Sequence, residues 1–317
     1  MSMFTPRVVD VVFAKHVRAL TGLFLLCASI GADSQAAEQV TPSQAEAAAA
    51  LLASGSADVQ PALADVDYLP NVVYANGKDL LDIYLPEGVE RPPVVVFFHG
   101  GGLLGGDKSH ARNLAARLLP LGVGVVSANY RLSPEATHPD HVEDAAASTA
   151  WVLSNIERFG ADPQNVYVTG HSAGAYLAAL LVLDPRYLAA HSVTRSALRG
   201  SILISPFLYV EETAPVRPKT VWGDDPQNWQ QASVTPYVNA SAPPMLLIYA
   251  DGDDAWRREQ IERFAAEMQA AGHRSVAAVE VPNRDHIRLM TELNDDDDEI
   301  GALVAQFMGQ HTSLLDH

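Results

Sequence analysis

Cysteine is almost absent from this chain. Cys27 is the single cysteine among 317 residues, and it lies in an apolar stretch near the N-terminus that has the pattern of an export signal. A mature chain cleaved behind that stretch contains no thiol. This excludes disulfide bonds, a cysteine nucleophile and a zinc site with cysteine ligands.

Basic residues are also scarce. The chain has 21 Lys and Arg against 38 Asp and Glu, which gives a formal net charge of −17 at pH 7. A nucleic-acid partner is therefore not expected, because phosphate binding requires a basic face. We interpret the acidity as a source of solubility, and a preference for neutral or cationic substrates is the alternative.

No hydrophobic run reaches the length of a bilayer span. The apolar run at residues 19–30 follows three basic residues and is too short to cross a membrane, and residues 34–36 (Ser-Gln-Ala) suit a signal peptidase. We therefore expect residues 1–36 to be a signal peptide cleaved after Ala36, with an uncleaved anchor as the alternative. The mature protein would be secreted or periplasmic, without stable membrane insertion.

The remaining chain is predicted to form a lead-in or lid segment followed by one domain. Residues 37–66 are rich in Ala, Ser and Gln. In residues 67–317, strand-like runs alternate with helix-like runs, which predicts an α/β fold with a mostly parallel sheet covered by helices on both faces. Residues 205–240 contain Pro, Trp and Asn with little periodicity, and we expect them to form a small cover over a pocket.

The segment Gly170-His171-Ser172-Ala173-Gly174 is the most informative in the chain. It follows the apolar run 166–169 and precedes the helix-like run 175–183. A strand, a tight turn and a helix in this order are typical of the nucleophile elbow of serine hydrolases. Ser172 is therefore the predicted nucleophile.

A second glycine motif precedes the elbow. His99-Gly100-Gly101-Gly102 follows the buried-strand pattern at residues 94–98, where the oxyanion loop of such a fold belongs. We expect the backbone N–H groups of Gly101, Gly102 and Ala173 to form the oxyanion hole. Each such donor typically lowers the barrier to acyl transfer by about 3 kcal/mol.

The serine needs a base and the base needs a carboxylate. His286 lies on the loop after the predicted last strand at residues 276–281, which makes it the expected base. Asp253 is our predicted acid, with Asp251 as its main rival, because both follow the predicted strand at residues 245–250. Asp254 also follows this strand, and the two of these three aspartates that do not serve the histidine are expected to cap the next helix. The order serine, aspartate, histidine is that of an α/β-hydrolase.

These motifs together resemble secreted carboxylesterases of the α/β-hydrolase superfamily, in the branch near hormone-sensitive lipase and kynurenine formamidase. The resemblance rests on residues 99–108, 129–134, 170–174, 222–226 and 282–286. It implies the α/β-hydrolase fold and a triad serine hydrolase that acts on a small-molecule ester without a cofactor. An aryl-formamidase is the alternative activity, and a non-catalytic binding module is the alternative from another class.

Four further residues are expected to bind substrate. Phe207, Trp222 and Trp256 would line the acyl or alcohol pocket, although a packing role is the alternative for each. Leu103 stands where the formamidase-like members of the resembled branch usually carry Trp. The acidic run 295–299 lacks the ligand spacing of a calcium loop, so no metal site is expected.

Overall fold

The structure is a computed structural model that describes residues 67–75, 79–217, 219–295 and 298–312. The expected signal peptide (1–36) and lead-in or lid segment (37–66) lie outside these residues. Among the helices of the described ranges, none is both long enough and apolar enough to span a bilayer.

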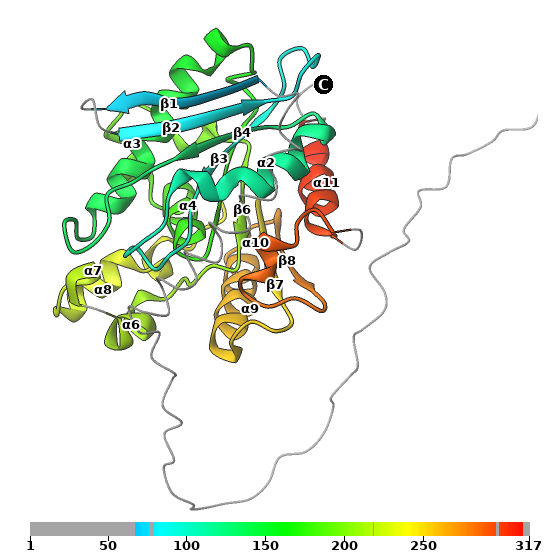
Figure 1. Cartoon of the computed structure of the whole chain (residues 1–317). Helices are drawn as coiled ribbons and strands as arrows, with labels where there is room; N and C mark the ends of the chain where they lie inside the picture. The colour runs from blue at the N-terminus through cyan, green and yellow to red at the C-terminus, as the bar shows by residue number, and fades with distance from the viewer. Residues whose placement is uncertain (1–66, 76–78, 218, 296–297, 313–317) are drawn as a thin grey trace, which may run out of the picture. The chain divides into compact units, whose positions relative to one another are not determined.

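An eight-stranded sheet organises the domain, with the strand order β1-β2-β4-β3-β5-β6-β7-β8 (Figure 1). The strands are β1 (Asp67–Ala75), β2 (Asp79–Leu85), β3 (Val94–Phe98), β4 (Gly124–Ala128), β5 (Val166–His171), β6 (Gly200–Ile204), β7 (Met245–Ala250) and β8 (Val276–Val281). β2 pairs antiparallel with β1 and with β4, and every other neighbouring pair is parallel. The predicted fold class is confirmed.

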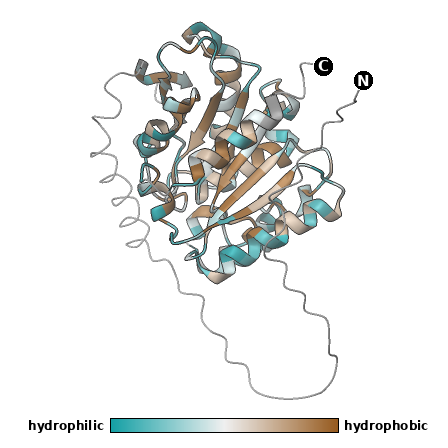
Figure 2. Ribbon diagram, turned by 90° about the vertical axis from the view of Figure 1, so that its right-hand side faces the viewer, coloured by the Kyte–Doolittle hydropathy of each residue, from teal (hydrophilic) through white to brown (hydrophobic). Residues whose placement is uncertain are grey.

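Helices cover both faces of the sheet. They are α2 (Arg112–Leu118), α3 (Asp140–Asn155), α4 (Ala173–Leu183), α5 (Pro185–Ala189), α6 (Val210–Thr213), α7 (Lys219–Trp222), α8 (Pro226–Ala232), α9 (Ala255–Ala270), α10 (Arg288–Thr291) and α11 (Ile300–Thr312). Side chains of β3 alternate between two cores, one shared with α3, α4 and α9 and the other with α2, α10 and α11. Because the central strands β3 to β7 are buried on both faces, they consist largely of apolar residues. Figure 2 shows hydrophobic strands between helices with polar outer surfaces.

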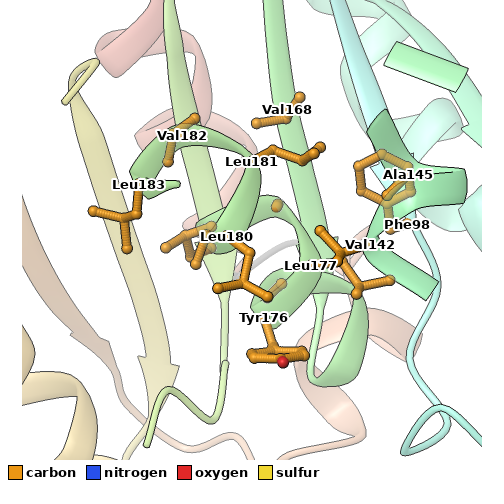
Figure 3. Close-up of a cluster of buried hydrophobic side chains, with 14 of the residues drawn as sticks. Phe98, Val142, Ala145, Val168, Tyr176, Leu177, Leu180, Leu181, Val182 and Leu183 are labelled. Atoms are coloured by element: carbon orange, nitrogen blue, oxygen red, sulfur yellow. The ribbon is translucent and has the colours of Figure 1, made fainter. Parts of the chain in front are cut away.

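Helix α4 lies at the centre of the larger core. All of its residues are buried, as expected for a helix that is apolar on every side. In Figure 3, Leu177 and Leu181 lie near Val142 and Val168, so α4 is held between the sheet and α3. This packing gives the serine at the start of α4 a rigid support.

The cover segment at residues 205–240 is made of short helical elements. It contains α6, the 3₁₀ turn η6 (Ala214–Val216), α7, α8 and the 3₁₀ turn η7 (Thr235–Tyr237). Helices this short have too few turns to show a 3.6-residue period, which explains why the sequence shows little periodicity here.

Candidate active site

The loops that follow five parallel strands lie together at the carboxyl ends of those strands, which form one edge of the sheet. β3, β5, β6, β7 and β8 run parallel, so their carboxyl ends share that edge. The glycine loop follows β3, Ser172 follows β5, Asp253 follows β7 and His286 follows β8. The topology therefore gathers side chains that are far apart in the chain.

Ser172 occupies the turn between β5 and α4 in a strained conformation. Its φ of 54° and ψ of −115° lie in a region that costs a non-glycine residue about 1–3 kcal/mol. Its N–H donates to Ile204 O at 2.9 Å, which extends the ladder between β5 and β6 into the turn. A Cβ on Gly174 would overlap the carbonyl group of Phe98 on β3, so this glycine allows α4 to pack directly on the neighbouring strand.

The glycine loop after β3 lies against the serine. A Cβ on Gly100 would stand 3.4 Å from Ser172 Cβ. Gly101 has a φ of 113° and accepts a hydrogen bond from Gly105 N at 3.2 Å, and Gly102 has a φ of 67°. In the part of the chain that the structure describes, the N–H groups of Gly101 and Gly102 donate to no backbone or side-chain acceptor. They are therefore free to bind a substrate oxygen.

The N–H group of Ala173 and the ring of His99 are two further features of the site beside the glycine loop. Ala173 begins α4, and N–H groups in the first turn of a helix have no partner inside the helix, so its N–H is available next to Ser172. The ring of His99 stacks on Tyr130 with 4.3 Å between centroids, and Nδ1 lies 2.8 Å from Gly100 O. Burial lowers the pKa of His99 to about 4, so the ring is neutral and its Nδ1–H donates to Gly100 O in the glycine loop.

Asp253 and His286 are in direct contact. His286 Nδ1 lies 2.8 Å from Asp253 Oδ1, and the side chain of the aspartate is fully buried. With Nδ1–H donating to the carboxylate, Nε2 is the nitrogen that can accept a proton. No hydrogen bond joins Ser172 Oγ to His286 within the described ranges, and such bonds are often long before substrate binds.

The neighbouring acids have other contacts. The Asp251 carboxylate is exposed and accepts a hydrogen bond from Arg284 N at 3.2 Å. Asp254 occupies the N-cap position of α9, but its side chain makes no capping hydrogen bond. The expectation that both would cap the following helix is therefore wrong, because the tight turn after β7 directs Asp251 toward the β8 loop.

Ser205 is a buried fourth member of this network that the sequence did not reveal. Its Oγ donates to Asp253 Oδ2 at 2.7 Å and lies 2.9 Å from His286 Nδ1. It follows β6, the strand between those of the serine and the aspartate, and it is fully buried with a φ of 49°. Asp253 Oδ2 also accepts from Ala250 N at 2.9 Å, so both carboxylate oxygens are fixed.

Arg257 is a buried cation beside the carboxylate. Its Nε lies 3.6 Å from Asp253 Oδ1 and its Nη1 donates to Ser205 O at 3.0 Å. Burial alone would raise the pKa of Asp253, but the hydrogen bond and charge of His286 and the charge of Arg257 hold it below its usual range. Burial and then the Arg257 charge lower the pKa of His286, against the opposing effect of Asp253. The imidazole is thus kept neutral and able to act as a base.

His171 packs against the loop that carries His286. Its Nε2 lies 2.8 Å from His286 O, and the two rings are 4.6 Å apart between centroids. Burial, followed by the nearby His286, lowers the pKa of His171 well below its ordinary value. The neutral ring therefore donates Nε2–H to the carbonyl oxygen and fixes the position of the His286 backbone.

The four predicted pocket residues have packing contacts. Leu103 and Phe207 are fully buried, and Trp222 packs edge-on against Phe207 with 5.6 Å between ring centroids. Trp256 is partly buried, and the Cζ atom of the Arg257 guanidinium lies 4.6 Å from its ring centroid. A role in lining the substrate pocket stays a prediction for these residues.

Two cavities of about 600 Å³ lie away from the Ser172 elbow. One lies between α3, α5 and α8, and the other lies between the end of α5 and the segment before β7. Within the described ranges, no cluster of three or more His, Cys, Asp or Glu side chains is placed to hold a metal ion.

Comparison with known proteins identifies the family to which this chain is similar. A family model described as alpha/beta hydrolase fold matches residues 95–290. The chain is 32% identical to Esterase LipQ of Mycobacterium tuberculosis over 246 residues, covering 70% of this chain and 56% of LipQ. It is 26% identical to the kynurenine formamidase of Salmo salar over 254 residues, covering 76% of this chain and 82% of that protein.

The chain spans about half the length of the first curated relatives that it matches, with 56%, 49% and 56% of their residues covered. Among solved structures, an esterase of Pyrobaculum calidifontis is similar with a TM-score of 0.64 and 24% sequence identity. That match covers 85% of this chain and 93% of the other, and it shows a shared fold.

Proposed function

This chain belongs to the α/β-hydrolase family, and on that premise we propose that it is a serine carboxylic-ester hydrolase that acts on small acyl or aryl esters through an acyl-enzyme intermediate. The observation that carries the proposal is the contact of Asp253 with His286 at the edge where the Ser172 elbow lies. The esterase relatives and the free N–H groups of the glycine loop support it.

The proposed reaction has two halves. His286 Nε2 takes the proton of Ser172 as the serine oxygen attacks the ester carbonyl, and the N–H groups of Gly101, Gly102 and Ala173 stabilise the resulting oxyanion. The protonated imidazole then gives its proton to the leaving alcohol, which leaves an acyl group on the serine. Water, activated by the same histidine, hydrolyses that acyl-enzyme and restores the free serine.

A fluorophosphonate probe tests this proposal directly. The full chain should be labelled at Ser172, and the Ser172→Ala variant should lose both the label and the turnover of a 4-nitrophenyl short-chain ester. Thermal unfolding of the variant would confirm that it is folded. Labelling and turnover that persist in the folded variant would refute the assignment of the nucleophile.

Aryl-formamide hydrolysis is a second candidate activity. The similarity to kynurenine formamidase extends over 82% of that protein, a larger share than for the esterase relatives. The same triad serves either leaving group. Parallel assays of phenyl acetate and N-formylkynurenine would distinguish the two, and the larger kcat/KM identifies the preferred class.

We also propose that the protein is exported. The support is the charge and apolar pattern of residues 1–36. Mass spectrometry of the N-terminus of the protein recovered from the extracytoplasmic fraction should find a chain that begins at Ala37. An intact N-terminus on protein confined to the cytoplasm would contradict the proposal.

A further inference from the structure

Arg217 places a guanidinium group beside the oxyanion loop. A Cβ on Gly102 would stand 2.7 Å from Arg217 Nη1, so the arginine head lies directly against this glycine. Gly102 is also one of the expected donors to the substrate carbonyl. The positive charge is therefore placed next to the point where the scissile group of a substrate would bind.

The structure holds this guanidinium on a rigid support. Its Cζ lies 5.4 Å from the ring centroid of Phe207, within the range of a cation–π contact. Phe207 is fully buried and stacks on Tyr176 with 4.7 Å between centroids. Because the side chain of Arg217 is only partly buried, its polar head can still contact a bound molecule.

Arg217 has no acidic partner among the described residues. The neighbouring glutamates on α6 are bonded elsewhere: Glu211 accepts from Thr235 Oγ1 at 2.9 Å and Glu212 pairs with Arg263 at 2.6 Å. Burial and then the charge of Arg257 lower the pKa of Arg217 to about 10. A partly buried cation without a counter-charge is unfavourable, and a ligand carrying an anion would relieve that cost.

The overall acidity of the chain does not oppose a local anion site. Repulsion from distant surface charges is screened beyond a Debye length of about 8 Å at physiological ionic strength. A guanidinium in contact with the ligand acts at shorter range and can bind both oxygens of a carboxylate. The local cation therefore dominates over the net charge of −17.

We propose that Arg217 is a specificity residue that binds a carboxylate carried by the substrate close to its scissile ester bond. This inference rests on the proposed esterase function and narrows its substrate class. The carboxylate could belong to the acyl part or to the alcohol part, since both extend from the carbonyl carbon beside Gly102. The chemistry shared by both is a small ester that bears one carboxylate.

Matched pairs of anionic and neutral esters test the proposal. Monoethyl succinate against ethyl butyrate probes the acyl part, and 4-acetoxybenzoate against its methyl ester probes the alcohol part. The wild-type protein should have the higher kcat/KM for the anionic member of at least one pair. Arg217→Gln should lower the anionic-to-neutral ratio of kcat/KM in that pair about ten-fold or more, as for loss of a charged hydrogen bond.

Two other variants make the result specific. Arg217→Lys keeps the charge but not the planar fork, so it should retain part of the preference and remains informative if the glutamine variant does not fold. Arg274→Gln removes an equal charge from an exposed site before β8, at the opposite edge of the sheet, and should leave the ratio unchanged. An equal ratio in the wild-type and folded Arg217→Gln proteins for both pairs would overturn the inference alone. Absence of turnover of all four esters would overturn the proposed function, and this inference with it.

Discussion

Arg257 Nε lies 3.6 Å from Asp253 Oδ1, and the two side chains are 4% and 0% exposed. The same carboxylate oxygen contacts His286 Nδ1 at 2.8 Å. The histidine therefore lies within the field of a buried acid and a buried cation, which have opposite effects on its proton affinity.

The acid limb of the pH–rate profile should report this arrangement. His286 must be neutral to accept a proton, so kcat/KM should fall as the pH drops through its pKa, which burial and the Arg257 charge set below the ordinary 6.5. Arg257→Gln removes a cation that opposes protonation, so the acid limb should move to higher pH. Arg257→Lys should stay closer to wild type. As a control, Arg258→Gln alters a partly exposed arginine of α9 that pairs with Glu280, and it should not move the limb.

Replacing Asp253, the proposed triad acid, should have a far larger effect on kcat than replacing Asp251. Asp253→Asn removes the carboxylate that holds Nδ1–H of His286, and kcat should fall by roughly a thousand- to ten-thousand-fold. Asp251→Asn changes an exposed carboxylate that contacts Arg284 N, and kcat should stay within a few-fold of wild type. Steady-state kinetics on one short-chain ester would compare them. A larger loss in the Asp251 variant would reverse our assignment.

Ser205 should contribute to both stability and turnover. Its hydroxyl donates to a buried carboxylate at 2.7 Å, and a hydrogen bond to a charged group contributes about 1.5–3 kcal/mol. Ser205→Ala should lower the free energy of unfolding by about this amount and kcat by about ten-fold. Ser201 on β6 is equally buried, but its Oγ has no partner among the described residues, so Ser201→Ala should be nearly neutral in denaturant melts and kinetics. Equal effects of the two changes would argue against a special role for Ser205.

Ser172, the proposed nucleophile, should reduce the stability of the fold. Ser172 is held at a φ of 54°, which glycine adopts without strain. Ser172→Gly and Ser172→Ala should both be inactive, but the glycine variant should be more stable than the alanine variant by about 1 kcal/mol. Equilibrium unfolding in urea would measure the difference. If the alanine variant were the more stable one, the turn would not be strained as described.

The predictions from sequence agree best with the structure where they depend only on residues that are close together in the chain. The apolar run at residues 245–250 becomes β7 with the same bounds, because a strand buried on both faces requires continuous apolar residues. The run at residues 276–281 also becomes β8 with the same bounds, although β8 is the last strand of the sheet and only its two end residues are buried. The glycines around Ser172 predicted the elbow, since only glycine fits where α4 crosses the carbonyl group of Phe98. Residue type and spacing carry this information directly.

The other features of the site depend on contacts between segments that are far apart in the chain. Asp251, Asp253 and Asp254 have the same side chain within four positions of the chain, and only the path of the turn after β7 separates the one that contacts His286 from the others. Ser205 and Arg257 gave no sequence signal, because an isolated serine or arginine becomes part of a network only when strands and helices distant in the chain meet. Arg217 is the same kind of case, since its position beside Gly102 depends on how the cover segment folds over the sheet edge.

The sequence by itself therefore determined the α/β architecture, the elbow and the glycine loop, because strand periodicity and turn chemistry are properties of consecutive residues. The tertiary structure alone decided which carboxylate supports the histidine, and which buried hydroxyl and cations surround it. Those choices depend on distances of a few ångströms between segments that the chain order leaves far apart.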